Sequence, residues 1–175
     1  MKKLIIWIIV MPCLSSAAHS QNRSSFGING GMALPVGALS SSCGPGVHFG
    51  IIARVPTSNP NLRFAMGGGI SILSGKWQAY PLGGSYETDY KPVSFFAGIQ
   101  IDEEKGAYFL PSVALNASDD GARIGFDLRI GGLVPINDGD WCFDLGVKFS
   151  LMNLIMKESG EENNVLLLFF GGLAF

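Results

Sequence analysis

The side chains that could carry out catalysis or bind a metal are few in this chain. The sequence has two histidines and three cysteines, and His48 is the one histidine that follows the apolar N-terminal segment. Acyl transfer requires a nucleophile, a base and an orienting acid within hydrogen-bond reach, and no serine stands two residues before or after His48. Zinc sites combine closely spaced Cys and His ligands, a spacing that Cys43, His48 and Cys142 lack. The sequence therefore predicts no catalytic residue, no metal and no cofactor.

Ten polar side chains recur at alternate positions of otherwise apolar segments. This lumen polar set consists of His48, Arg54, Arg63, Gln100, Tyr108, Arg123, Asp127, Arg129, Asp144 and Lys148. In a closed sheet, Asp127 and Lys148 become near-opposite neighbours across the turn "INDGD". Arg54 and Arg63 face each other across "PTSNPN", and because like charges directly opposite destabilise a sheet, we expect an anion nearby, with Asp144 as the candidate. The set forms a plug of salt bridges, or alternatively a gated ion path or a catalytic cluster. The presence of buried ion pairs does not decide between these alternatives.

The segments that carry these side chains alternate with a period of two, which is typical of β-strands. Eight such segments follow one another, at residues 26–36, 47–55, 62–72, 93–101, 107–116, 123–134, 141–151 and 163–175. The connections after the second, fourth and sixth are short, those after the first, third and seventh are longer, and only "ASDDG" breaks this rule. Strands of this length cross a bilayer when tilted, and alternating short turns and long loops are typical of outer-membrane barrels. We expect an all-β, eight-stranded antiparallel up-and-down transmembrane β-barrel with a filled polar lumen.

Which face of the barrel is wet decides between a membrane protein and a soluble lipocalin-like carrier, whose apolar face points inward. The polar face is mostly Gly, Ala and Ser, which suits the narrow interior of an eight-stranded barrel, and it accounts for many of the 24 glycines. The apolar face is bulky and uncharged, as a lipid-facing surface must be. Aromatic residues stand near strand ends, as in an interfacial girdle: Phe26, Trp141 and Phe175 on the turn side, Trp77 and Tyr90 on the loop side.

The two ends of the chain and the longest loop carry separate signals. Residues 1–20 combine a positive start, an apolar stretch and small residues, which predicts a signal peptide and a barrel domain at 21–175; a lipoprotein anchored at Cys13 is the alternative. Cys43 and Cys142 map to opposite ends of the barrel, so we expect no disulfide.

The loop 74–91 is a candidate for recognition through its aromatic side chains, which are Trp77, Tyr80, Tyr86 and Tyr90. The alternative is that these side chains lie on lipid headgroups.

The terminal sequence "FFGGLAF" resembles the C-terminal insertion signal of outer-membrane barrels. Leu167, Phe169, Leu173 and Phe175 match its alternating apolar positions and terminal aromatic residue, although Gly171 stands where a larger residue is commoner. Residues 22–175 resemble the small outer-membrane β-barrel family that includes the membrane domain of outer membrane protein A, and "GMALPVG" is similar to its Bacteroidetes-type members. The resemblance implies the outer membrane of a Gram-negative bacterium, contact with its lipid, and insertion by the barrel-assembly machinery.

The composition excludes one class of partner. Charged residues make up 15% of the chain and the formal net charge is −2, whereas nucleic-acid binding needs a concentrated basic patch. We expect a barrel with a structural or surface-interaction role and no enzymatic activity, with an extracellular partner that the sequence does not identify. The alternatives are a soluble carrier of an apolar ligand and a barrel enzyme that acts on outer-leaflet lipid.

Overall fold

The computed structural model describes residues 24–75, 78–79, 85–86, 89–103, 106–118, 121–136, 141–155 and 163–175. The predicted signal peptide at residues 1–20 lies outside these residues. None of the helices in the described part of the chain is long and apolar enough to cross a membrane.

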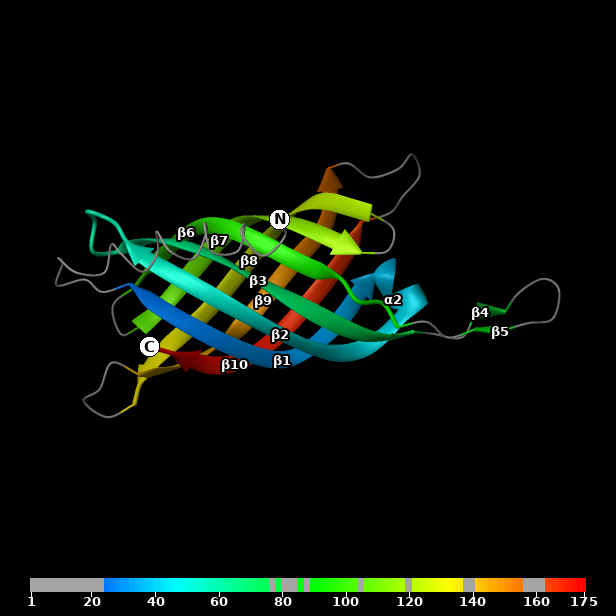
Figure 1. The fold of residues 1–175 in the computed structure, drawn as a ribbon, viewed down its shortest axis with the longest axis horizontal. Helices are drawn as coiled ribbons and strands as arrows, with labels where there is room; N and C mark the ends of the chain where they lie inside the picture. The colour runs from blue at the N-terminus through cyan, green and yellow to red at the C-terminus, as the bar shows by residue number, and fades with distance from the viewer. Residues whose placement is uncertain are drawn as a thin grey trace, which may run out of the picture.

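Eight antiparallel strands close into a barrel, as the alternation predicts (Figure 1). Around the barrel the order is β1, β10, β9, β8, β7, β6, β3 and β2. Barrel strands that follow one another along the chain are therefore neighbours in the sheet, and β1 pairs with β10 to close it. The strand bounds are β1 (Ser25–Gly37), β2 (Cys43–Pro56), β3 (Leu62–Gly75), β6 (Val93–Asp102), β7 (Ala107–Ser118), β8 (Gly121–Pro135), β9 (Cys142–Ile155) and β10 (Asn164–Ala174).

The first and last strands close the barrel in an uninterrupted register. Gly30 of β1 lies opposite Gly171 of β10, and the pairing extends from Gly27 with Ala174 to Gly37 with Asn164. Beyond it, Phe26 and Phe175 exchange two backbone hydrogen bonds of 2.7 and 2.8 Å. Phe175 and Phe26 therefore extend the pairing of β1 with β10 by one residue, and neither strand has an open edge there.

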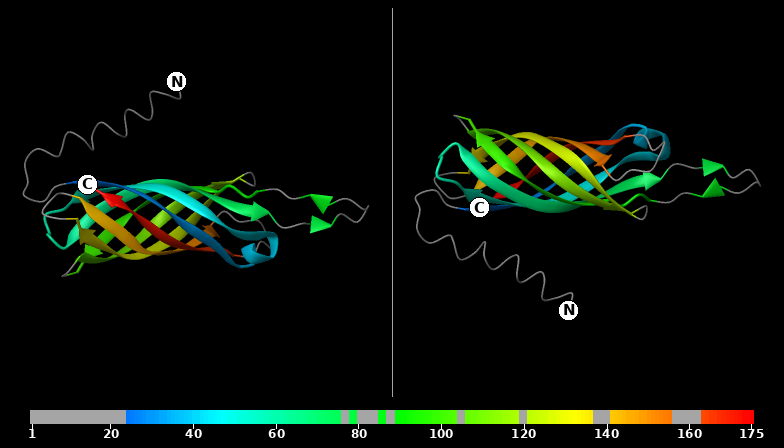
Figure 2. Two further views of the ribbon diagram at one scale, coloured as in Figure 1. Left: turned by 90° about the horizontal axis from the view of Figure 1, so that it is seen from below. Right: turned by 90° about the horizontal axis from the view of Figure 1, so that it is seen from above.

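Three short elements were not expected from the sequence, and all lie at one end of the barrel (Figures 1 and 2). The helix α2 (Leu39–Ser42) joins β1 to β2. The strands β4 (Gln78–Ala79) and β5 (Ser85–Tyr86) pair with each other between β3 and β6, and Figure 2 shows this hairpin projecting beyond the barrel. We call this end the loop end, and the end that holds Phe26 and Phe175 the turn end. Cys43 pairs with Gly75 at the loop end and Cys142 with Ala174 at the turn end, and the two are unbonded.

Burial follows the predicted alternation. Phe49 and Ile51 on β2 are 57% and 50% exposed, whereas the residues on either side of this pair, His48 and Ile52, are 6% and 0% exposed. Glycines accommodate this crowded interior: a Cβ added at Gly146 would lie 2.7 Å from the Phe170 ring and from Gly131 Cα. The outer face of the barrel therefore carries large apolar side chains, and the interior holds the buried charged side chains together with some apolar ones.

The interior has an apolar layer next to the loop end. It consists of Ala33, Leu39, Cys43, Leu73, Met152, Leu166 and Leu168, with Tyr90 packed against it. Leu39 comes from α2, so the helix places an apolar side chain over the barrel mouth. This layer explains why β10 is apolar on both faces, because Leu166 and Leu168 point into it.

Candidate functional site

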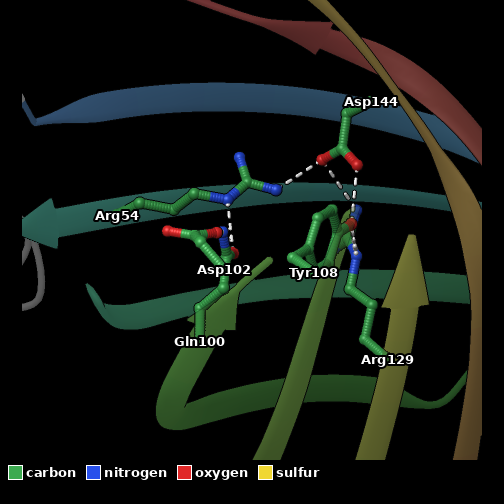
Figure 3. Close-up of polar contacts among 6 residues, drawn as sticks. All are labelled: Arg54, Gln100, Asp102, Tyr108, Arg129 and Asp144. Carbon is green, nitrogen blue, oxygen red and sulfur yellow. Dashed lines mark hydrogen bonds and ion pairs between the residues drawn. The ribbon is translucent and has the colours of Figure 1, made fainter. Parts of the chain in front are cut away.

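Below the apolar layer, the interior holds a network of buried charged side chains centred on Asp144 (Figure 3). Its carboxylate accepts hydrogen bonds from Arg54 Nη2 at 2.5 Å, Arg129 Nη2 at 3.1 Å and the Tyr108 hydroxyl at 2.6 Å. Arg129 Nε also donates to the Tyr108 oxygen at 2.9 Å. Asp144 is 1% exposed and Arg54 is 0% exposed. One carboxylate on β9 therefore joins side chains from β2, β7 and β8 across the barrel, and charge-assisted bonds of this kind are the strong ones.

From Arg54 the network continues toward the turn end. Arg54 Nε donates to Gln100 Oε1 at 2.8 Å, and Gln100 Nε2 donates to Asp102 Oδ1 at 2.6 Å. Asp102 also forms an ion pair with Arg63 at 2.8 Å (Arg63 Nε to Asp102 Oδ2). Asp102 is thus a member of the network that the lumen polar set omits, because the expected fourth segment, residues 93–101, ends just before it. Its parity with Gln100 is the signal that reveals it.

The expectation that Arg54 and Arg63 lie opposite each other is wrong, because the register of β2 and β3 pairs each with another residue. Arg54 lies opposite Ala65, and Arg63 lies opposite Pro56. The two guanidiniums therefore have separate carboxylates: Arg54 binds Asp144, as expected, whereas Arg63 binds Asp102.

A second carboxylate, Asp127, organises the middle of the barrel. Lys148 Nζ donates to Asp127 Oδ2 at 2.9 Å, and Ser150 Oγ donates to Asp127 Oδ1 at 2.5 Å. Asp127 lies directly opposite Ser150, and Lys148 lies one inward position away, as expected for near-opposite neighbours. The Arg129 guanidinium carbon lies 3.7 Å from the centroid of the Phe170 ring, an attractive cation–π geometry. That contact accounts for the inward aromatic side chain on β10.

His48 lies inside the barrel and forms one side-chain hydrogen bond within the described residues. Its Nδ1 is 3.0 Å from Ser71 Oγ, and the two side chains are 6% and 4% exposed. Sequence spacing missed this pair because the two residues lie on adjacent strands, β2 and β3, directly opposite each other. A histidine next to a serine is one part of a nucleophilic site, but catalysis also requires an orienting acid and access for the substrate. The described hydrogen bonds of His48 include no carboxylate.

Arg123 differs from the other members of the lumen polar set. It lies near the beginning of β8, is partly exposed, and its Nη1 donates to the carbonyl oxygen of Ala122 at 3.3 Å. The structure does not bring it to Asp144 or to Asp127. No group of three or more His, Cys, Asp or Glu side chains in the described ranges has the arrangement of a metal site.

The proposed insertion signal lies on the outer face of β10. Phe169 and Phe175 are 44% and 43% exposed, and Leu167 and Leu173 share their parity. The Phe175 ring lies 5.7 Å from that of Phe26 and 4.9 Å from that of Trp141, measured between centroids. The three expected aromatic residues of the turn end therefore form one cluster.

The recognition loop is described only in part. Trp77 and Tyr80 lie outside the described residues, and Tyr86 belongs to β5, where the backbone alone is described. Tyr90 forms a backbone bridge with Leu73 and packs against the interior apolar layer. Tyr90 therefore contacts the interior apolar layer at the loop end.

Comparison with known proteins finds the same architecture elsewhere. No protein-family model and no curated protein sequence matches the chain. Neisserial surface protein A, a crystal structure, aligns over 86% of this chain and 95% of its own, with a TM-score of 0.59 and 17% identity. The two chains share a fold. The Yersinia pestis outer membrane protein Ail, determined in a phospholipid bilayer nanodisc, aligns over 87% of this chain and 100% of its own, with a TM-score of 0.48 and 11% identity.

Proposed function

We propose that this chain is an outer-membrane β-barrel protein of a Gram-negative bacterium with a structural or surface-interaction role. The observation that carries the proposal is the reversal of polarity between the two faces of the sheet. Large apolar side chains such as Phe95, Val113 and Ile130 are 58%, 61% and 56% exposed, whereas Arg54, Asp127 and Asp144 are 0%, 1% and 1% exposed. In water this arrangement would expose a large apolar surface. In a bilayer the apolar side chains would face lipid, and the charged side chains would lie inside the barrel, away from lipid.

The proposed role does not include an open pore. The interior holds a network of ion pairs below a layer of packed apolar side chains, and the cavity between His48, Arg129 and Lys148 measures about 10 Å³. A soluble lipocalin-like carrier is disfavoured by the same observation, because a ligand-carrying barrel needs an apolar cavity far larger than one water molecule.

An enzymatic role is disfavoured by the position of the serine–histidine pair found among the described residues. His48 and Ser71 are buried inside the barrel wall, at 6% and 4% exposure, and lipid would have to enter the interior to reach them.

The projecting hairpin at the loop end is the part of the chain that is best placed for surface interaction (Figure 2). We propose outer-membrane lipid and the barrel-assembly machinery as the partners of the outer face and of Phe175.

The substitution Phe175→Ala tests the proposed assembly route. We expect much less folded protein in the outer-membrane fraction of cells, because the terminal aromatic residue is the proposed recognition element of the assembly machinery. Refolding of the purified variant into detergent should change little, since the backbone pairing with Phe26 does not need the ring.

The matched control is Phe26→Ala, which removes the same ring contact from the other side. Aromatic pairs contribute about 0.5–1.5 kcal/mol each. Because Phe175→Ala also removes the contact with the Trp141 ring, it should lose about twice as much stability in vitro as Phe26→Ala. If Phe26→Ala lowers the outer-membrane level as much as Phe175→Ala does, Phe175 acts through stability alone and the proposed signal is wrong.

A further inference from the structure

The buried network of the barrel carries more positive than negative charge. Among the described residues, its cations are Arg54, Arg63, Arg129 and Lys148, and its carboxylates are Asp102, Asp127 and Asp144. The pair of Arg63 and Asp102 is partly exposed and balances itself. Three buried cations, Arg54, Arg129 and Lys148, therefore share two carboxylates. An excess charge away from water is costly unless a counter-charge accompanies it.

The two buried carboxylates are already occupied. Asp144 accepts bonds from two guanidiniums and a phenol, and Asp127 accepts bonds from Lys148 and Ser150. Within the described residues, Arg54 Nη1 is buried and has no hydrogen-bond partner. This nitrogen is a buried donor of the network that no described side chain pairs with.

A small cavity lies beside the two remaining cations. Its lining includes Asn29, His48, Ser94, Arg129 and Lys148, and its volume is about 10 Å³. Gly50 helps to keep it open, because a Cβ at that position would lie 3.0 Å from both Asn29 Oδ1 and His48 Nε2. Lys148 has three donors and Arg129 has five, and their described bonds use one and two of them respectively. The cavity is thus rich in donors and positive, and with the side chains as they stand it has room for about one water-sized sphere.

We propose that the barrel interior binds one small monovalent anion such as chloride between Arg129 and Lys148, and that the flexible side chain of Lys148 shifts to admit it. The anion balances the third buried cation and accepts hydrogen bonds from the ammonium and the guanidinium. The inference concerns the interior of the barrel and does not depend on the surface-interaction role proposed above.

The first test uses the unaltered protein. Folded barrel in detergent is heated in sodium chloride, sodium bromide or sodium gluconate at one ionic strength and pH, and the unfolding midpoint is measured. A ligand that binds only the folded state raises this midpoint in a concentration-dependent manner. We expect a saturating rise with chloride and bromide but not with gluconate. In crystals grown with bromide, an anomalous peak between Arg129 and Lys148 is expected. No halide dependence and no peak would mean that the cavity holds water only, and would overturn the proposal.

The substitution Arg129→Gln separates specific binding from a general salt effect. It leaves the buried cations Arg54 and Lys148 with one carboxylate each, so we expect the variant to lose both the halide-dependent rise and the bromide peak. The control Arg63→Gln alters the pair near the turn end and should retain both. A bromide peak that persists in Arg129→Gln, or a halide effect lost in both variants, would contradict a site at Arg129. The bromide measurement on the unaltered protein decides the question even if a variant does not fold.

Discussion

Replacing Asp144 with asparagine should destabilise the folded barrel by about 3–5 kcal/mol, the typical cost of removing one partner of a buried ion pair. Asparagine keeps the shape of the side chain but not its charge. Arg54 and Arg129 would then remain buried with no carboxylate between them, since Asp144 accepts from both. Tyr108 would lose a charged acceptor as well. The free energy of unfolding, measured with urea in detergent micelles or lipid vesicles, gives the size of the loss.

The matched control is Asp89→Asn, which also removes a carboxylate from an ion pair. Asp89 lies 3.3 Å from Lys91 Nζ, and both side chains are more than half exposed. Exposed pairs contribute about 0–1 kcal/mol, so this variant should differ little from the unaltered protein. If Asp144→Asn costs no more than Asp89→Asn, the interior network is hydrated and the account of a desolvated plug fails.

Replacing Ile51 with lysine should destabilise the barrel by about 2–4 kcal/mol in a bilayer, because a charge on the lipid-facing side near the midplane carries that cost. Ile51 lies near the middle of β2 and is 50% exposed on the outer face. In a water-soluble barrel the same change at an exposed site would typically cost within about 0.5 kcal/mol. Unfolding from lipid vesicles of one composition measures the difference.

The conservative change Ile51→Met provides the reference for this position, because it keeps an apolar side chain of similar size on the same face. We expect it to unfold close to the unaltered protein. A lysine variant as stable as the methionine variant would show that the outer face of β2 does not meet hydrocarbon.

The barrel and the orientation of its side chains could be predicted from the sequence because both depend on a local signal. In a strand with two unlike environments, the side-chain period of two is visible in the residues themselves. His48 inside and Ile51 outside follow from that period alone. The terminal Phe175 could likewise be placed in the last strand.

The partners inside the barrel could be predicted only in part, because they depend on closure. Arg54 and Asp144 lie on β2 and β9, and only the curvature of the whole sheet brings them within 2.5 Å. Register matters equally: an offset of one inward position separates Arg63 from Arg54 and leaves Arg63 to Asp102. The contact between His48 and Ser71 also depends on register, because cross-strand neighbours have no fixed spacing in the sequence.

The apolar layer at the loop end had no clear sequence signal. Leu166 and Leu168 break the alternation of β10 instead of following it, and Leu39 lies in a short helix without helical periodicity around it. Only the assembled barrel shows that these side chains share one layer. The layer lies at the loop end of the interior, and the ion pairs lie below it.

The most direct test of the central claim is electrophoresis of the outer-membrane fraction in detergent, with and without boiling. A closed membrane barrel resists the detergent until it is heated, so the unheated protein should migrate differently from the boiled protein. The account predicts this heat-dependent shift for protein recovered from the outer membrane. Recovery of the protein in the soluble periplasmic fraction, with identical migration before and after boiling, would contradict it.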